Sequence, residues 1–294
     1  MESEEIKAYR KAGKIASEAV RHIKGLVKKD MLLIDIARDV DKKIKELGGK
    51  PAFPVNLSLN EIAAHYTPSQ NDETRAQGLL KIDIGVQVNG FIADTAFSVD
   101  LSDSGEFSEM IKLNEELVNE SIKNLTIDSS AKEIGNYIAK KIKNTNYSVI
   151  KSLSGHLLEK DNLHAGVNIS NHENGSSFLL KDNAFAIEPF LTEGEGDIYE
   201  GKNSEIFILE KDAPARDRDA RELLNFIKEN YGTLPFCRRW LEEEGFKKLD
   251  FLLPVLCHNK ILHNYPVLIE KSKKPVSQFE HTVIITDKVE VTTK

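Results

Sequence analysis

Two aspartates lie in a segment with the signature of a tight β-hairpin. Apolar and polar or small side chains alternate before an Asn89-Gly90 dipeptide, which favours a two-residue turn. Such a turn places Asp83 opposite Ala96 and Asp94 opposite Gly85. Because side chains alternate along a strand, both carboxylates then share one face as diagonal neighbours, with Cα atoms about 7–8 Å apart.

Two carboxylates at this separation repel each other unless a cation or a proton lies between them. A metal ion is the simpler solution at neutral pH. An isolated aspartate pair is also common on a solvent-facing sheet surface, since strand faces are often polar. Other residues of the chain must therefore decide between a metal site and an ordinary polar face.

Three further side chains favour the metal site. Glu188 interrupts the apolar segment AFAIEPF, Glu280 lies among strand formers in QFEHTVIIT, and His156 follows Gly155 in VIKSLSGH. A lone acid inside an apolar strand is costly to bury without a partner. Four carboxylates and one imidazole suit a pair of divalent ions such as Mn, Fe, Co or Zn, whereas a structural zinc site would favour cysteine.

Hydrophobic periodicity outlines the elements that must position these residues. Helical spacing predicts helices over residues 4–25, 32–47, 107–125 and 130–144. The return strand of the hairpin is expected from Phe91 to Val99, and residues 51–70 are interpreted as extended structure and loop. The remaining strand-like segments lie near 147–152, 183–191, 205–210 and 275–286. The mixture indicates an α/β (α+β) protein.

Composition narrows the classes of protein. The 294 residues carry a net charge of -7, which disfavours a sequence-specific nucleic-acid-binding surface. Two cysteines are too few for a disulfide-stapled secreted domain. The charged N-terminus is unlike a signal peptide, and no apolar run reaches the roughly 18 residues of a membrane helix. We therefore expect a cytoplasmic protein without a membrane partner.

Several segments, in this order, resemble the signatures of methionine aminopeptidases, and the type II, archaeal-like branch fits best. These segments are PAFPVNLSLNEIAAHYTP, KIDIGVQVNGFIADTAFSVD, SGHLLEKDNLHAG, AFAIEPF and QFEHTVII. The resemblance spans residues 4–294. It implies the pita-bread (creatinase/aminopeptidase) fold, in which two α/β halves surround a curved antiparallel sheet flanked by helices.

The resemblance also implies roles for individual residues. The family's metal ligands fall on Asp83, Asp94, His156, Glu188 and Glu280. The residues implied in catalysis are Glu188, as the carboxylate that carries a proton, with His65 and His164. Those implied in substrate binding are Phe53, His65, His164 and Tyr265. We interpret His22, His172, His258 and His281 as ordinary histidines, and the role of His263 stays open.

A helical insertion is expected within the main domain. Short helical patterns around 223–227, 240–244 and 249–256 interrupt the otherwise mixed chain. They resemble the winged-helix-like subdomain that separates type II from type I enzymes. We expect a catalytic domain over residues 1–211 and 261–294, with an insertion subdomain over 212–260.

The function implied by this resemblance is removal of the initiator methionine from nascent proteins and peptides, with a small second residue preferred. Two divalent metal ions, of Co, Mn, Fe or Zn, would activate a bridging water for attack on the scissile carbonyl. The resemblance suggests a monomer and leaves an association with the ribosome open. One alternative is a prolidase-like or Xaa-Pro aminopeptidase. The other is a non-catalytic pita-bread binding protein, although such relatives lose metal ligands.

Two stretches depart from the family pattern. Asp161 occupies a position where relatives often have an aromatic residue, and residues 167–175 lack the proline expected after the His-Ala-Gly segment. These departures leave the implied ligands intact. They concern the shape of the rim around the substrate.

Overall fold

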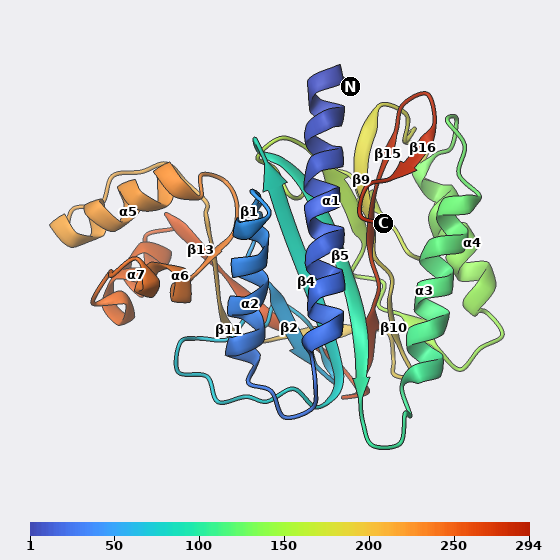
Figure 1. The fold of residues 1–294 in the computed structure, drawn as a ribbon, viewed down its shortest axis with the longest axis horizontal. Helices are drawn as coiled ribbons and strands as arrows, with labels where there is room; N and C mark the ends of the chain where they lie inside the picture. Colours follow the sequence, from blue (N-terminus) through green and yellow to red (C-terminus); the bar gives the residue numbers. More distant parts are fainter.

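The chain folds into seven helices and sixteen strands, and the computed structural model describes residues 1–294 (Figure 1). The helices are α1 (Ser3–Leu26), α2 (Leu33–Glu46), α3 (Ser108–Lys123), α4 (Ala131–Ile142), α5 (Arg218–Asn230), α6 (Arg238–Glu243) and α7 (Leu249–His258). The strands are β1 (Lys50–Pro51), β2 (Asn56–Leu59), β3 (Ile62–Ala64), β4 (Gly78–Val88), β5 (Phe91–Leu101), β6 (Ser148–Val149), β7 (Gly155–Leu158), β8 (Asn168–Ile169), β9 (Asn183–Ile187), β10 (Phe190–Thr192), β11 (Ile198–Leu209), β12 (Phe236–Cys237), β13 (Leu262–Glu270), β14 (Val276–Gln278), β15 (His281–Ile285) and β16 (Val289–Val291).

The four helices predicted in the first half of the chain are confirmed. Two of them begin with a capping box, Glu2 with Glu5 before α1 and Ser130 with Glu133 before α4. Each box satisfies backbone N–H groups that the first turn leaves without a partner. Both helices are amphipathic, and their apolar faces are buried in the largest core cluster of the protein.

The predicted hairpin is also confirmed. Strands β4 and β5 pair antiparallel in the expected register, with Asp83 opposite Ala96 and Gly85 opposite Asp94. The turn residues Asn89 and Gly90 have φ values of 54° and 86°. Positive φ at both positions is what a type I′ turn requires, so local sequence fixes the register. The face opposite the aspartates is buried in the core, where α1 packs against both strands.

The remaining strands complete the pita-bread fold, which is confirmed. All pairings between strands are antiparallel. The sheets have the orders β1-β4-β2 with β5 on β4, β16-β15-β9-β7-β8, β14-β10-β6 and β12-β11-β13-β3. In Figure 1, α1 and α2 lie over the sheet of β4, and α3 and α4 lie beside the other half of the molecule. The helices therefore cover the outside of a curved sheet system.

Hydroxyl groups connect the two halves along β5. The amide of Asp94 donates to Thr282 Oγ1 over 2.7 Å, and the same hydroxyl donates back to the carbonyl of Asp94 over 2.8 Å. The hydroxyl of Thr95 donates to the carbonyl of Glu280 over 2.9 Å. All four residues are buried. These bonds fix the backbone at two of the acids that the sequence singled out.

Helices α5, α6 and α7 gather to one side of the body (Figure 1). They share a separate core cluster, which also includes Phe207 of β11 and Leu262 of β13. A buried polar contact attaches them to α2, where Asp41 accepts from Arg239 over 2.8 Å and from the indole of Trp240 over 2.7 Å. We propose that residues 212–260 form the insertion subdomain that the sequence led us to expect.

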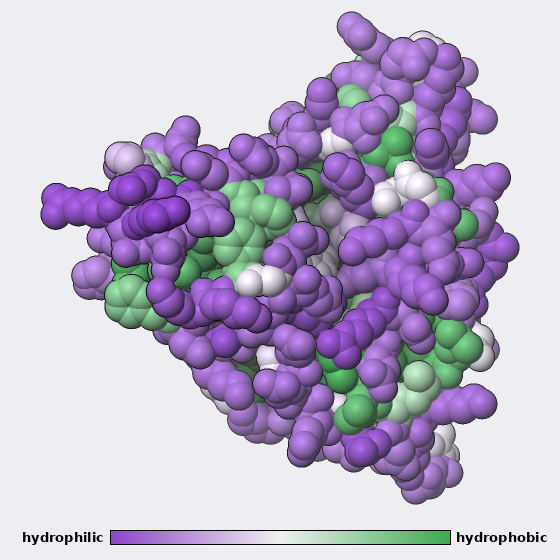
Figure 2. Space-filling view, turned by 60° about the vertical axis from the view of Figure 1, so that its left-hand side comes forward, coloured by the Kyte–Doolittle hydropathy of each residue, from purple (hydrophilic) through white to green (hydrophobic).

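The surface is mainly hydrophilic. Figure 2 shows apolar side chains in small, separate patches on one face. Large hydrophobic side chains with substantial exposure are Leu26, Ile127, Leu179, Tyr199 and Phe251. None of the helices combines the length and the apolar composition that a membrane crossing requires.

Candidate active site

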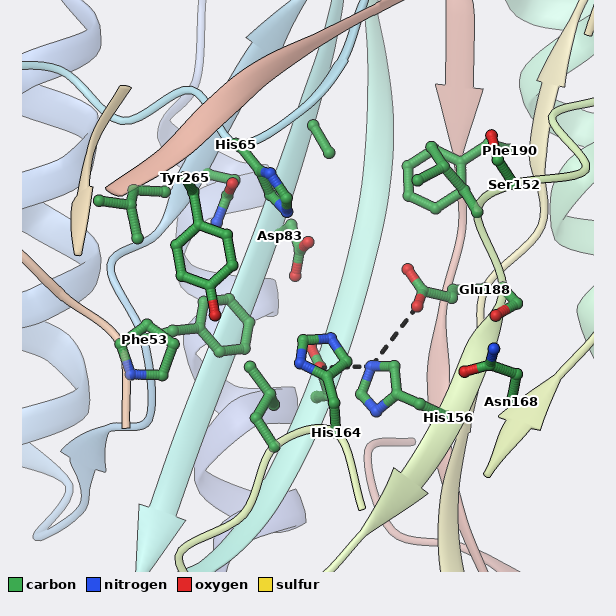
Figure 3. Close-up of a pocket in the computed structure, with 18 residues that line it drawn as sticks. Phe53, His65, Asp83, Ser152, His156, His164, Asn168, Glu188, Phe190 and Tyr265 are labelled. Carbon is green, nitrogen blue, oxygen red and sulfur yellow. Dashed lines mark ion pairs between the residues drawn. The ribbon is translucent and has the colours of Figure 1, made fainter. Parts of the chain in front are cut away.

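A cavity of about 290 Å³ opens on the face of the β4–β5 hairpin that carries Asp83 and Asp94. Every residue predicted for the site lines this cavity except Glu280, which is buried directly beside Asp94. Figure 3 shows Phe53, His65 and Tyr265 on one side of the cavity and His156 and Glu188 on the other. The structure therefore brings together side chains from segments that are far apart in the sequence.

Glu188 and Glu280 occupy interruptions between strands, and not strand interiors as the sequence suggested. Glu188 lies between β9 and β10, and Glu280 lies between β14 and β15. The strands on each side pair with one another, through Ile187 with His281 and through Phe190 with Gln278. The two breaks are thus adjacent, and both acids can leave the regular alternation and turn toward the aspartates.

The acids and His156 form one buried cluster. His156 Nε2 lies 3.6 Å from Asp94 Oδ2 and 3.5 Å from Glu188 Oε1 (Figure 3). Ligand atoms of Asp94, His156 and Glu280 all lie within 4.8 Å of one another. Asp83 stands beside them on the same face of the hairpin.

Several carboxylate oxygens in this cluster have no hydrogen-bond partner. They are Asp83 Oδ1, Asp94 Oδ1 and both oxygens of Glu280, all of them buried. Buried polar atoms are nearly always paired, because an unpaired group keeps its full desolvation cost. A cluster of acids with orphaned oxygens beside an imidazole is the donor set that divalent cations bind.

The protonation of these groups follows from their burial. Burial raises the pKa of Asp83 to about 6. Burial, followed by repulsion from neighbouring acids, raises the pKa of Asp94, Glu188 and Glu280. Burial lowers the pKa of His156 to about 3, which leaves a neutral imidazole that can serve as a ligand. Bound cations would offset the repulsion and hold the carboxylates ionised.

The residues present therefore fit a divalent metal centre. Asp83, Asp94, His156, Glu188 and Glu280 would hold the metal, as the sequence predicted. The Nδ1 atom of His156 faces the carbonyl of Leu157 at 3.4 Å, so Nε2 is the nitrogen directed into the cluster. A carbonyl that accepts a hydrogen bond from one ring nitrogen selects the tautomer of a ligating histidine.

His65 lies at the opposite wall in an unusual backbone conformation, with φ of 65°. Non-glycine residues rarely adopt positive φ, and they do so where the surrounding structure holds them. Its Nδ1 lies 3.1 Å from the carbonyl of Pro266, and its ring packs edge-on against Tyr265 with centroids 5.1 Å apart. Burial lowers the pKa of His65 to about 4, so the ring is neutral near pH 7.

A carbonyl oxygen only accepts hydrogen bonds, so Nδ1 of the neutral His65 ring must carry the proton. Its Nε2 is then restricted to accepting a hydrogen bond. The ring of His164 lies 4.3 Å from that of His156, and burial lowers the pKa of His164 as well. The two histidines thus present neutral rings to the cavity.

The apolar end of the cavity depends on one glycine. A Cβ atom added at Gly85 would lie only 2.2 Å from the ring of Phe53. The space above Gly85, on the face of the hairpin that carries the aspartates, is therefore filled by Phe53. Leu163 and Ile206 extend the apolar lining.

Sequence reasoning missed several residues that line the cavity or lie behind its wall. Asn56 pairs with Asp83 across β2 and β4, and Pro235 comes from the chain between α5 and β12. Gln278 is buried and donates to Asp83 and Glu188. A signal for Gln278 did exist, since it lies two residues before Glu280 in the quoted QFEHT segment. Pro235 carried no local signal.

The two stretches that depart from the family pattern have different positions. Asp161 has φ of 56° and donates its amide to the carbonyl of Gly90 at the hairpin tip over 2.9 Å. In the segment 167–175, Asn168 lines the cavity and Asn171 donates to the carbonyl of Glu188 over 3.0 Å. Asn171 thus supports the backbone of a site residue.

Fold and site together define a metallopeptidase of the pita-bread class. The chain belongs to metallopeptidase family M24, whose sequence profile matches residues 7–287. A methionine aminopeptidase of Methanocaldococcus jannaschii is 39% identical over 99% of this chain and 100% of its own length. One of Pyrococcus horikoshii is 42% identical over 96% of this chain and 97% of its own. The relationship predicted from the motifs is confirmed.

Solved structures show the same fold at lower identity. A thermophilic Arx1 has a TM-score of 0.86 at 16% identity, covering 99% of this chain and 91% of that one. Methionine aminopeptidase of Thermotoga maritima has a TM-score of 0.72 at 20% identity, covering 100% and 98%. The prolidase of Pyrococcus horikoshii has a TM-score of 0.62 at 16% identity, and only 63% of its chain is covered.

Proposed function

We propose that this chain is a metal-dependent aminopeptidase that removes N-terminal methionine from proteins and peptides. The observation that carries the proposal is the buried cluster of Asp83, Asp94, His156, Glu188 and Glu280. This cluster lies beside a cavity that Phe53 also lines. Curated relatives that are about 40% identical over almost their full length are methionine aminopeptidases, which supports the same substrate.

The apolar end of the cavity would receive the methionine side chain. Phe53, Leu163 and Ile206 offer apolar contact there. A charged first residue would be rejected, because an unpaired buried charge costs several kcal/mol. We propose that the second residue of the substrate is small, as the resemblance to methionine aminopeptidases implies.

Divalent metal ions held by the five ligands would supply Lewis-acid activation of a water molecule and of the scissile carbonyl. We propose two ions per chain, of Co, Mn, Fe or Zn. Four carboxylates carry more negative charge than one divalent ion balances. This excess of charge supports two bound ions.

The remaining chemistry belongs to side chains of the protein. The carboxylate of Glu188 would accept the proton of the attacking water and return it to the leaving amine. His164 would donate a hydrogen bond to the substrate carbonyl as charge develops on its oxygen. Nδ1 of His65 is hydrogen-bonded to the carbonyl of Pro266. Nε2 of His65 would therefore accept a hydrogen bond from the N–H of the scissile amide. This last role makes the catalytic role that the family resemblance implied for His65 more specific.

We further propose a cytoplasmic monomer that acts on nascent chains, with the ribosome as a candidate partner. The substrate class supports this setting, because initiator methionine is exposed on newly made proteins. Cleavage of Xaa-Pro bonds is the weaker alternative, since a prolidase is only 16% identical to this chain, whereas the methionine aminopeptidases are 39% and 42% identical.

Peptide assays test the proposal directly. The purified protein, supplied with Mn or Co, should release methionine from Met-Ala-Ser and leave an Xaa-Pro peptide intact. Met-Lys peptides should be poor substrates by comparison. Comparable kcat/KM for Met-Ala-Ser and an Xaa-Pro peptide, or for Met-Ala and Met-Lys peptides, would refute the proposed specificity.

A further inference from the structure

Gln278 connects two acids that come from opposite halves of the fold. Its Nε2 donates to Asp83 Oδ2 over 3.1 Å and to Glu188 Oε2 over 3.4 Å. Asp83 belongs to β4, whereas Glu188 follows β9. Only 2% of Gln278 is exposed, so solvent cannot replace these two bonds.

The backbone of Gln278 is itself held in place. Its amide donates to Ser98 Oγ over 2.9 Å, and the same hydroxyl donates to the carbonyl of Gln278 over 2.8 Å. Ser98 lies on β5, the partner strand of β4. The carboxamide is therefore fixed relative to the hairpin that carries Asp83.

The acids depend on Gln278 to different degrees. Asp94 and Glu280 have their backbones fixed by Thr282 and Thr95, and together with His156 they already bring ligand atoms within 4.8 Å of one another. Asp83 lies outside that group, and its Oδ1 has no partner. The hydrogen bond from Gln278 to Oδ2 leaves Oδ1 free to bind a cation.

We propose that Gln278 is a positioning residue for the metal subsite on the Asp83 side. Its hydrogen bond holds the carboxylate of Asp83 so that one oxygen remains available, while the ligand atoms of Asp94, His156 and Glu280 come together without a bond to Gln278. This inference rests on the proposed two-metal function. Outer partners of metal ligands typically change metal affinity by about 10- to 100-fold when they are removed.

The test uses Gln278→Met, which keeps the length of the side chain and removes its hydrogen-bonding groups. Metal-free wild-type and variant proteins are titrated with Mn²⁺ by calorimetry and with Co²⁺ by visible absorbance. The variant should bind the first ion like the wild type and the second about 10- to 100-fold more weakly. The control Gln77→Met, at an exposed position of the chain, should bind both ions as the wild type does.

Three results would overturn the proposal, and they are distinguishable. Unchanged binding of both ions by Gln278→Met shows that Asp83 does not need the bond. Equal weakening of both ions, with a lower unfolding temperature, shows a general structural role instead. If the wild type itself binds no pair of ions, the two-metal function fails and the role of Gln278 fails with it.

Discussion

Glu188, in the break between β9 and β10, lies beside Glu280, in the break between β14 and β15. Two acids that are 92 positions apart in the sequence therefore reach the same cluster. Regular alternation would fix each side chain to one face of its strand. A break in both strands at the same level removes that constraint. The metal site therefore depends on an irregularity shared by the two strands.

Replacement of Asp94 by Asn should abolish most of the activity. Asp94 has ligand atoms close to both His156 and Glu280, and a neutral amide cannot supply the charge of a carboxylate ligand. We expect kcat/KM on Met-Ala-Ser to fall by at least roughly 100-fold. This corresponds to a loss of about 3 kcal/mol of transition-state stabilisation. A fully active variant that still binds two metal ions would remove Asp94 from the site.

Replacement of Gly85 by Ala should displace Phe53 from the cavity. The new methyl group would lie 2.2 Å from the Phe53 ring, which is far below van der Waals contact. We expect a higher KM for methionine substrates and a stability loss of about 1–3 kcal/mol from overpacking. Gly25→Ala is the matched control, because a Cβ there meets no atom within 4 Å. Equal behaviour of the two variants in denaturant titrations and kinetics would contradict the packing described for Phe53.

Replacement of His65 by Ala should lower activity without loss of metal. His65 bonds to Pro266 and packs on Tyr265, and it lies outside the acid cluster. Removal of one preorganised hydrogen-bonding group typically costs roughly 100- to 1000-fold in kcat. A parallel fall in kcat and kcat/KM would indicate an interaction made mainly in the transition state. Loss of bound metal from this variant, measured by elemental analysis, would mean that His65 belongs to the metal site.

Replacement of Asp41 by Ala should loosen the attachment of α6 to α2. Arg239 is fully buried, and Asp41 is its closest ionic partner at 2.8 Å. Removal of one partner from a buried ion pair typically costs about 3–5 kcal/mol. Urea titration should show this loss, whereas Asp39→Ala, on the same helix and outside the contact with Arg239, should change stability little. Similar midpoints for the two variants would show that the contact contributes little to stability.

Much of the site could be predicted from sequence because the hairpin that carries two of its acids is determined by residues close together in the chain. Asn89 and Gly90 fix the turn, and the turn fixes the register of Asp83 and Asp94. The breaks at Glu188 and Glu280 could not be predicted in the same way, because they follow from pairing between distant strands. The position of Pro235 in the cavity wall depends on how the α5–α7 segment packs, which no local pattern encodes. Family resemblance supplied the assignment of ligands that spacing alone left open.

The central claim is that the five clustered ligands hold metal ions without which the chain cannot cleave its substrate. The most direct measurement is methionine release from Met-Ala-Ser by protein whose metal content has been brought to zero and verified by elemental analysis. We predict no activity above background in the metal-free protein, and recovery when Mn or Co is added back. Full activity of the verified metal-free protein would contradict the claim.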